Sequence, residues 1–482
     1  MVGRLRNHPG RWSRAGHAET MFGVQSCSKM YTATAVLLAV QQGLVELDVP
    51  ITRYLPEFRV NSTFEDHPER LITLRHLLSH TAGFTHEAPV GSNYLVGRES
   101  FQAHCESIAD TWLRFPVGHH FQYSNLGVDL AGYVLQRCSG QPFHEFVRRE
   151  LLAPLEMTRT TFNPREILRE PSRAIGHAAG TARVPVRVPM VAAGGLYTSV
   201  NDACRYLQFH LNQGASLLDP ALLAEMYQVP GATDREQGYG LGIALARAGD
   251  IPVRGHGGGG FGFLSDIYWA PDAELGVVVL TNSTNHPLQW KLASDIFRDL
   301  IPTRPHAPTA SPVTVSAPSM VGLAGDYTGR GDDTFTFAVD GDDGVLTRDD
   351  TRHVVEFIGP NEFRAGQAQY RFRDLDDAGR PTYLESTSDG FVFYRNEVPE
   401  PSPAEPEGPW NRDYVIRVNG VPDGTARLRK ENGIPLFDHP AGGTLRLREH
   451  VPGVYVAATG EVLDLTRTPP TYANVRLHPT SD

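Results

Sequence analysis

Two stretches rich in proline divide the 482-residue chain into three parts. The first stretch runs from Pro302 to Pro318 and is also rich in Ser, Thr and Ala; the second runs from Val398 to Pro409. Proline fixes one backbone dihedral and lacks an N–H, so such stretches resist packing and act as linkers. A chain of this length is also too long for one ordinary core. We therefore predict domains at 1–301, 319–397 and 412–482, joined by linkers at 302–318 and 398–411.

The first part carries patterns of both helix and strand. Apolar residues recur at helical spacing in four segments, and two later segments are typical of strands. This mixture predicts a domain of α and β elements between residues 22 and about 300. The expected helices are Tyr31–Gln42, Leu74–Leu78, Leu126–Gln136 and Asp202–Leu211, and the expected strands are Phe263–Trp269 and Gly276–Leu280.

The two C-terminal parts show short alternating segments separated by turn signals such as Asp340–Gly344. Alternation with regular turns is typical of a β meander, sandwich or barrel, so both parts are predicted to be small all-β domains. The expected strands are Thr334–Val339, His353–Ile358, Tyr370–Arg373, Phe391–Tyr394, Tyr414–Val418, Thr425–Arg429, Leu445–Arg448 and Val454–Ala457.

The composition argues against nucleic-acid and membrane partners. The formal net charge of -11 lacks the clustered positive excess that phosphate recognition needs. The longest apolar run, Ala33 to Val40, is far shorter than the roughly 20 residues of a membrane span. No apolar stretch follows the basic N-terminus as it would in a signal peptide. The chain as it stands is therefore predicted to be cytoplasmic.

The sequence offers no convincing set of metal ligands. His76 and His80 are four residues apart on an expected helix, but Leu77 occupies the place where a His-Glu-x-x-His zinc site has its Glu. Packing or capping explains these histidines better. The four cysteines form no Cys-x-x-Cys pair and are expected to be buried as small hydrophobic residues. We predict no metal and no cofactor.

Ser26 and Lys29 form a Ser-x-x-Lys sequence just before the first expected helix, and Lys29 is one of only three lysines in the chain. A lysine ammonium can lose its proton when desolvated, whereas a guanidinium stays charged. On a helix, Lys29 would lie one turn after Ser26, at an N-terminus that favours developing negative charge. The pair fits a serine nucleophile with a lysine base; an ordinary N-cap followed by a solvated lysine is the alternative.

A second candidate group is Tyr123-Ser124-Asn125, which directly precedes the helical pattern Leu126–Gln136. Its tyrosine can relay a proton while its asparagine holds a substrate amide. Tyr-x-Asn also occurs at Tyr394 and Tyr472, so only the location in the same domain as Ser26 favours this group.

A third candidate group is the glycine-rich segment Gly255–Gly262, which contains His256. Dense glycines let a backbone approach a ligand closely and offer N–H groups to an oxyanion. A phosphate loop would need Gly-Lys-Ser/Thr and a following helix, and both are missing from the sequence. A flexible turn is the remaining alternative. The chain has no Gly-x-Ser-x-Gly elbow, which argues against an α/β-hydrolase.

Taken in this order and at these intervals, the three groups resemble the serine β-lactamase and penicillin-binding-protein-like superfamily. Within it, they are most similar to the class C β-lactamase-related esterases, D-aminopeptidases and carboxypeptidases. The resemblance covers roughly residues 20–300 and implies an α+β fold: an antiparallel sheet flanked by helices, with an all-helical lobe. The two β domains resemble, more loosely, lipocalin-like accessory domains. Further landmark-like segments are Gly43–Asp48, Tyr54–Phe58, Ile72–Phe84, Pro154–Met157 and Ala192–Tyr197.

The resemblance implies roles for the first two groups. Ser26 would be the nucleophile that forms an acyl-enzyme, and Lys29 and Tyr123 would share the proton transfers. Asn125 would contact the substrate amide. Which of Lys29 and Tyr123 is the principal base stays open, because their titrations would be coupled.

The resemblance also implies that His256-Gly257-Gly258 lines one wall of the site on a strand. The backbone N–H groups of Ser26 and Gly259 would form the oxyanion hole, each donor typically contributing about 3 kcal/mol. True β-lactamases commonly have Lys-Thr-Gly in place of His256-Gly257-Gly258, so the cation that binds a β-lactam carboxylate is replaced. Strong β-lactamase activity is therefore not expected.

The sequence thus predicts a metal-independent serine hydrolase that cleaves a small amide or ester, such as a D-amino-acid peptide or a short-chain ester. The alternative is a catalytically impaired binding protein that retains the fold. This alternative arises because the family usually has a helix and two sheet strands before the nucleophile, whereas 25 residues precede Ser26 and Arg4–Arg14 shows no strand pattern. We favour a longer natural N-terminus, with export, over a shortened sheet. The two β domains would gate the cleft or mediate homodimer formation, and their sequence favours neither.

Overall fold

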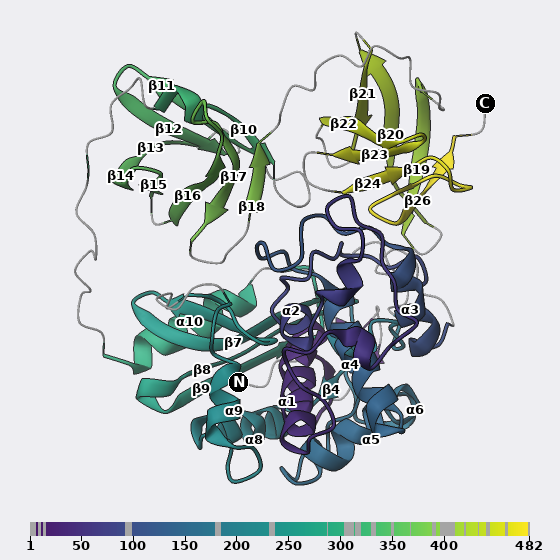
Figure 1. Cartoon of the computed structure of the whole chain (residues 1–482). Helices are drawn as coiled ribbons and strands as arrows, with labels where there is room; N and C mark the ends of the chain where they lie inside the picture. Colours follow the sequence, from purple (N-terminus) through teal and green to yellow (C-terminus); the bar gives the residue numbers. More distant parts are fainter. Residues whose placement is uncertain are drawn as a thin grey trace.

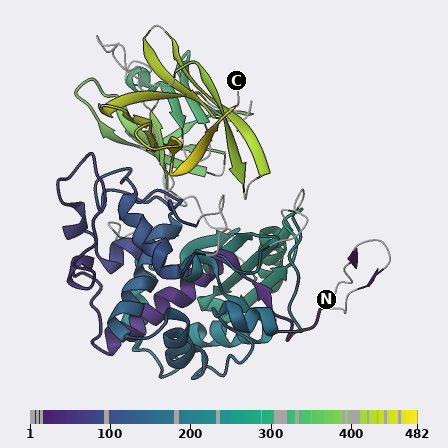
Figure 2. The same cartoon turned by 90° about the vertical axis from the view of Figure 1, so that its right-hand side faces the viewer.

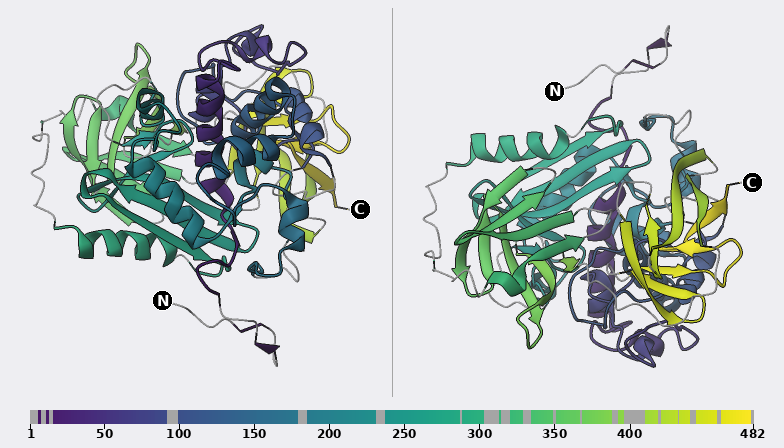
Figure 3. Two further views of the ribbon diagram at one scale, coloured as in Figure 1. Left: turned by 90° about the horizontal axis from the view of Figure 1, so that it is seen from below. Right: turned by 90° about the horizontal axis from the view of Figure 1, so that it is seen from above.

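In a computed structural model of the chain, a unit of helices and sheet is followed by two all-β units (Figure 1). Figure 2 and Figure 3 show both all-β units on the same side of the first unit, next to each other. This arrangement confirms the predicted fold class. The structure describes residues 6–7, 11–12, 16–91, 99–178, 185–230, 237–286, 288–302, 313, 320–328, 334–348, 351–366, 368–387, 392–395, 410–418, 421–431, 433–439, 444–457 and 461–480.

The first unit is built on a five-stranded antiparallel sheet in the order β5-β6-β7-β8-β9. One face of the sheet packs on the main core through residues such as Ile267 and Trp269. The other face packs on helix α10 (Leu288–Leu300) through Tyr268 and Val279. The strands are β5 Gly238–Tyr239, β6 Ala244–Ala248, β7 Ile251–Gly260, β8 Phe263–Ala270 and β9 Leu275–Thr281.

Helix α1 (Ser28–Gln41) runs through the centre of the first unit, and every residue from Ser28 to Ala39 is buried. A helix that is buried on all sides needs partners for its polar groups. Thr32 Oγ1 donates to the Ala192 carbonyl at 2.7 Å, and Thr34 Oγ1 lies 2.8 Å from the Tyr206 hydroxyl. The residues just before α1 are therefore held at a fixed place in the core.

The other helices form a lobe beside the sheet and cover its inner face. Within the lobe, a Cβ added at Gly132 of α4 would lie 2.6 Å from the Ala192 Cβ, so glycine allows α4 and α7 to pack closely. The helices are α2 Leu74–Leu78, α3 Phe101–Ser107, α4 Asn125–Ser139, α5 Phe143–Val147, α6 Pro164–Arg169, α7 Val191–Gly194, α8 Val200–Leu211 and α9 Pro220–Glu225, with short helices η1 Gln25–Cys27, η2 Ile51–Arg53, η3 Pro68–Arg70, η4 Ile108–Asp110, η5 Arg148–Leu152 and η6 Pro271–Ala273.

Short strands precede the central helix. Strand β3 (Phe22–Gly23) pairs with β4 (Tyr197–Thr198). Strands β1 (Arg6–Asn7) and β2 (Arg11–Trp12) pair with each other, although the sequence of Arg4–Arg14 shows no strand pattern. Two-residue strands are too short to show an alternating pattern, so the sequence could not predict β1 and β2.

The second unit is a nine-stranded antiparallel sheet in the order β13-β12-β11-β10-β18-β17-β16-β15-β14. The segment His353–Ile358, predicted as one strand, is divided between β13 and β14 at opposite ends of this order. The chain turns at Val355, whose N–H donates to the Gly344 carbonyl. The elements are η7 Val321–Leu323, β10 Gly325–Thr328, β11 Thr334–Asp340, β12 Asp343–Arg348, β13 Thr351–Val354, β14 Glu356–Gly359, β15 Glu362–Ala365, β16 Ala368–Leu375, β17 Pro381–Ser386 and β18 Val392–Arg395.

The third unit is a closed barrel of eight strands, so its backbone edges are paired all round. Its core contains Tyr414, Phe437 and Tyr455. The strands are β19 Arg412–Val418, β20 Val421–Glu431, β21 Ile434–Asp438, β22 Thr444–Val451, β23 Val454–Ala457, β24 Val462–Asp464, β25 Thr471–Tyr472 and β26 Val475–Pro479.

The structure tests some of the predictions about the whole chain and leaves others open. The predicted linkers lie outside the described residues except for Pro302, Val313, Trp410 and Asn411, and the domain boundaries stay predictions. Of the four free cysteines, Cys27 and Cys105 are buried as expected, whereas Cys138 is partly buried and Cys204 is exposed, contrary to the expectation. Among the described helices, none has the length and apolar character needed to cross a membrane.

Candidate active site

Ser26 lies in the short helix η1, immediately before α1, and its side chain is partly exposed. The preceding residue, Gln25, is buried with a φ of 48°, in the left-handed region that non-glycine residues rarely occupy. Such a conformation costs free energy and persists only where the surroundings impose it, as at functional sites. The sharp turn presents the Ser26 hydroxyl at the surface of the site while Lys29 continues into the core.

Lys29 is fully buried and its ammonium nitrogen is surrounded by oxygen atoms. Nζ lies 3.0 Å from Ser26 Oγ, 2.8 Å from Asn125 Oδ1 and 2.9 Å from the Ala193 carbonyl oxygen. It also lies 4.8 Å from the centre of the Tyr123 ring. A buried ammonium needs such partners because its desolvation is costly. The structure therefore rules out the alternative of a solvated lysine.

The second predicted group, Tyr123-Ser124-Asn125, lies next to Lys29. Ser124 caps α4: its Oγ accepts from the Leu126 N–H and donates to the Thr85 carbonyl at 2.6 Å. This cap places Asn125 at the start of the helix, where Nδ2 lies 3.3 Å from His86 Nε2. The Tyr123 ring packs on His80, with ring centres 4.4 Å apart. His80 thus supports Tyr123, while His76 caps α2 together with Thr73, as packing or capping predicted.

Strand β7 forms the opposite wall, and together with β8 it is bonded to η1 and to the residue before it. The Val24 carbonyl accepts from Ser265 Oγ at 2.8 Å, and Cys27 Sγ donates to the His256 carbonyl at 3.0 Å. A Cβ added at Gly258 would lie 2.1 Å from the Val24 carbonyl oxygen, so only glycine permits this approach. Gly255–Gly260 is therefore part of a strand packed against the Ser26 turn, and only Phe261 and Gly262 form a turn, which leads to β8.

His256 is buried and neutral in this wall. Burial, followed by the nearby Lys29 cation, lowers its pKa to about 3. Its Nδ1 contacts the Gly257 carbonyl, which can only accept, so Nδ1 carries the proton and Nε2 accepts from the Tyr239 hydroxyl at 2.7 Å. His256 thus brings no positive charge to the site. The burial of Cys27 raises its pKa to about 12, so its thiol is inert although it follows Ser26.

A buried ion pair that no sequence pattern predicted supports the residue that holds Lys29. Asp129 and His104 have no exposed side-chain surface, and Asp129 Oδ2 lies 3.2 Å from His104 Nε2. The other oxygen, Oδ1, accepts from the N–H groups of Ala192 and Ala193 at 2.9 and 3.0 Å. Ala193 is the residue whose carbonyl holds Lys29. A carboxylate within the apolar run Leu126–Gln136 was the signal that could have revealed this support.

The third unit reaches the same region. Glu461, between β23 and β24, accepts from Thr85 Oγ1 at 2.7 Å and pairs with Arg114 at 3.2 Å. Asn474 Nδ2 donates to the Glu87 carbonyl at 2.9 Å. Thr85 in turn accepts from Ser124, which caps the helix that begins at Asn125. Two consecutive hydrogen bonds therefore connect the barrel to the start of α4: Thr85 Oγ1 donates to Glu461, and Ser124 Oγ donates to the Thr85 carbonyl.

A second buried carboxyl lies behind the glycine-rich strand. Asp266 of β8 pairs in register with Gly257, is 3% exposed, and its Oδ2 has no hydrogen-bond partner among the described residues. Burial raises the pKa of this carboxyl from 3.8 to about 7. Between these values the folded protein holds a proton that the unfolded chain has lost, so this group makes stability fall as the pH rises from about 4 to 7.

We expect the Asp266→Asn variant to gain stability relative to the natural protein as the pH rises, because an amide cannot ionise. The gain in unfolding free energy between pH 4 and 8 is on the order of 4 kcal/mol at most. Chemical denaturation at several pH values measures this difference. Asp272→Asn, in the exposed turn after β8, is the control and should change stability little at any pH. A pH-independent difference for Asp266→Asn would contradict the prediction.

The structure therefore brings the predicted residues together from three distant segments. Lys29 Nζ contacts Ser26 and Asn125 and lies over the Tyr123 ring, and the Tyr123 and His256 ring centres are 6.0 Å apart. Gly258 and Gly259 follow His256 on β7, next to η1. The catalytic, substrate-binding and oxyanion roles of these residues stay predictions. Within the described residues, no group of three or more potential ligands could hold a metal ion.

Comparisons with known proteins agree with this geometry. A family model described as Beta-lactamase matches residues 9–293. Esterase EstB of Burkholderia gladioli is 31% identical over 55% of this chain and 78% of its own length. The D-alanyl-D-alanine-carboxypeptidase/endopeptidase AmpH of Escherichia coli K12 is 25% identical over 59% of this chain and 76% of its own. The crystal structure of SurE with D-Leu superposes with a TM-score of 0.56 and 25% identity, covering 82% of this chain and 93% of SurE.

Proposed function

This chain belongs to the beta-lactamase family, and from that premise we propose that it is a serine hydrolase acting through an acyl-enzyme. The contact that carries the proposal is the one between Ser26 Oγ and the buried Lys29 Nζ, 3.0 Å apart. A serine hydroxyl becomes nucleophilic when a neighbouring base removes its proton. In its neutral form Lys29 can take this proton, and Asn125 and Ala193 hold its nitrogen in place away from solvent.

The proposed reaction has two acyl transfers. Ser26 Oγ attacks the substrate carbonyl carbon, and its proton passes to the Lys29 and Tyr123 pair. The bond to the leaving amine or alcohol then breaks, and the leaving group takes that proton. Water attacks the resulting ester and gives a proton to the same pair, which returns that proton to Ser26 Oγ as the acid product departs. In both steps, the N–H groups of Ser26 and Gly259 would stabilise the oxyanion.

We propose that the substrate is a small ester or amide with no anion next to the scissile bond. A fixed cation facing the leaving group would favour a substrate carboxylate, but His256 is neutral and both of its ring nitrogens contact protein atoms. Among the relatives, this chemistry fits the esterase EstB better than the carboxypeptidase AmpH. The D-Leu in SurE supports D-amino-acid amides as the second substrate class to test.

Covalent labelling tests the proposal directly. A fluorophosphonate probe is expected to label the folded protein on Ser26, as identified by mass spectrometry of the labelled peptide. Ser26→Ala should lose the label, and Ser62→Ala, which changes a serine bound to Glu65 outside the site, should keep it. p-Nitrophenyl esters, D-alanyl amides and nitrocefin then rank the substrate classes. An unlabelled folded protein would favour the alternative, a binding protein that retains the fold.

A further inference from the structure

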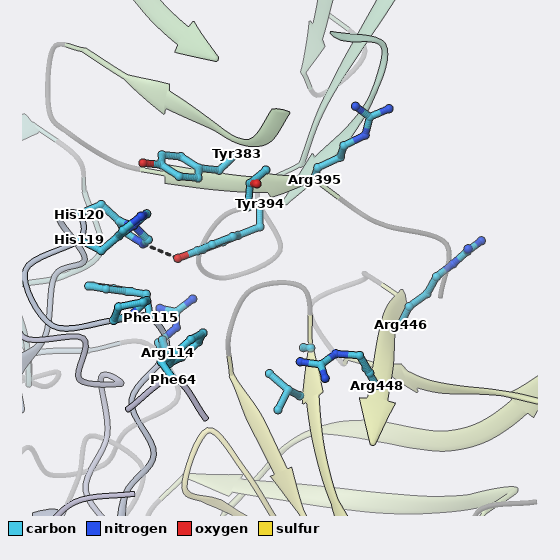
Figure 4. A pocket seen from close by; sticks show the side chains of 14 residues that line it. Phe64, Arg114, Phe115, His119, His120, Tyr383, Tyr394, Arg395, Arg446 and Arg448 are labelled. Atoms are coloured by element: carbon cyan, nitrogen blue, oxygen red, sulfur yellow. Dashed lines mark hydrogen bonds between the residues drawn. The ribbon is translucent and has the colours of Figure 1, made fainter. Parts of the chain in front are cut away.

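A cavity of about 310 Å³ lies where the three units meet, away from Ser26. This volume is at the lower end of the range typical of small-molecule sites. The first unit contributes the segment 114–120 and Phe64, the second contributes β17 and β18, and the third contributes β22 and β23 (Figure 4). A ligand here would contact all three units at once.

The lining of this junction cavity is strongly cationic. It contains Arg114, Arg395, Arg446 and Arg448, and none of the described lining residues is acidic. This excess is local, because the chain as a whole carries a formal net charge of -11. A concave surface lined by charges of one sign concentrates ligands of the opposite sign.

The four arginines differ in whether their guanidinium groups already have hydrogen-bond or ion-pair partners. Arg114 pairs with Glu461, and Arg395 donates to the carbonyls of Gly322 and Ala324. Arg446 and Arg448 are exposed on the same side of β22, two residues apart, and neither has a hydrogen bond or an ion pair with a described residue. In Figure 4 the Arg448 guanidinium extends towards Phe64 and Arg114, whereas that of Arg446 points away from them.

The opposite wall is aromatic. Phe115 packs on His120 with ring centres 3.8 Å apart, and His120 Nε2 contacts the Tyr394 hydroxyl (Figure 4). Burial, followed by the charges of His119 and Arg114, lowers the pKa of His120 well below its usual value, so its ring is neutral. Phe64 is 46% exposed, which is a large fraction for a phenylalanine. One side of the cavity can therefore take an apolar group while the other takes an anion.

We propose that the junction cavity binds a small organic anion that combines an aromatic or apolar body with a carboxylate or phosphate group. The oxyanion group would accept from the forked N–H donors of Arg448, with Arg446 adding charge at the rim. The apolar body would pack between Phe64 and the Phe115 and His120 rings. Because the ligand contacts three units, its binding stabilises their present arrangement by mass action.

Binding is best tested in the Ser26→Ala protein, so that the result does not depend on the proposed hydrolase activity. Isothermal titration with phenylacetate and phenyl phosphate should show one saturable site with a Kd below about 10 mM. Phenylacetamide, which has the same body without the charge, should not bind. The anion that binds more tightly identifies the preferred head group. The affinity should fall as the salt concentration is raised.

Two arginine variants locate the site. Arg448→Gln is expected to weaken binding by about tenfold or more, since a charged hydrogen-bonding partner is lost. Arg476→Gln removes an exposed arginine from β26, four strands away around the barrel, and should bind like the parent. Both changes are at exposed positions, and unchanged thermal melting shows that each variant is folded. No saturable binding of either anion, or equal binding by Arg448→Gln, would overturn the proposal.

Discussion

Replacing Lys29 with methionine is expected to lower kcat/KM on the best ester substrate by about 10³-fold or more. Methionine fills a similar volume but can neither accept the Ser26 proton nor return it. Ser26 Oγ would lose the neighbour that now lies 3.0 Å away, and Asn125 Oδ1 would lose one at 2.8 Å. Steady-state kinetics and the rate of fluorophosphonate labelling measure the same loss independently.

Lys291, an exposed lysine of the same unit, provides a matched control. Lys291 lies on α10, with its side chain 69% exposed and paired with Asp295. Lys291→Met makes the same chemical change at the surface and should leave kcat/KM unchanged. Thermal melting verifies that Lys29→Met is folded. A folded Lys29→Met variant with more than a tenth of the natural activity would show that Tyr123, or another group, is the principal base.

The first half of the site could be predicted from the sequence because its geometry is local. Lys29 lies three positions after Ser26, close to one turn of a helix, and lysine is rare in this chain. Tyr123 and Asn125 directly precede a clear helical pattern, so their place at a helix start was also predictable. The sequence patterns could not predict the distances between these segments, because those distances depend on how α1, α4 and β7 pack.

The parts that were missed depend on contacts between residues far apart in the chain. The Ala193 carbonyl that holds Lys29 is 164 residues away from it, and a backbone carbonyl leaves no mark in a sequence. Tyr239, whose hydroxyl donates to His256 Nε2, lies on a two-residue strand, which is too short for its periodicity to be recognised. The contact of Glu461 with Thr85 spans 376 residues and two units, so no local pattern could predict it.

These long contacts suggest that the site is held from several sides and not by the Ser26 turn alone. Val24 and Cys27 fix η1 to β7 and β8, Ser124 fixes the start of α4 to Thr85, and Asp129 fixes α7. Cys27 and Ser124 directly adjoin Ser26 and Asn125, and the Asp129 connection ends at Ala193, whose carbonyl holds Lys29. Activity should therefore be sensitive to residues that do not touch substrate, and Asp129 is the strongest case.

The Asp129→Ala variant is expected to lose about 3–5 kcal/mol of unfolding free energy, because it leaves a buried partner uncompensated. Burial opposes the charge on His104, but the hydrogen bond and charge of Asp129 outweigh it and raise the pKa of His104. The stabilisation from this pair is present below the usual histidine pKa and is lost as the pH rises through the raised value. Asp129→Ala also leaves the Ala192 and Ala193 N–H groups without their acceptor.

Asp129→Asn separates the two contributions, because its amide keeps one oxygen for the Ala192 and Ala193 N–H groups but carries no charge for His104. It should cost less than Asp129→Ala at every pH, and its difference from the natural protein should shrink as the pH rises and His104 becomes neutral. Denaturant unfolding at several pH values, with NMR titration of His104, measures both effects. Asp295→Ala, which removes a surface carboxylate paired with Lys291 and Arg298, should leave stability within error. Equal stability of the alanine and asparagine variants would mean that Asp129 acts only as a counter-ion and does not position Ala193, the residue that holds Lys29.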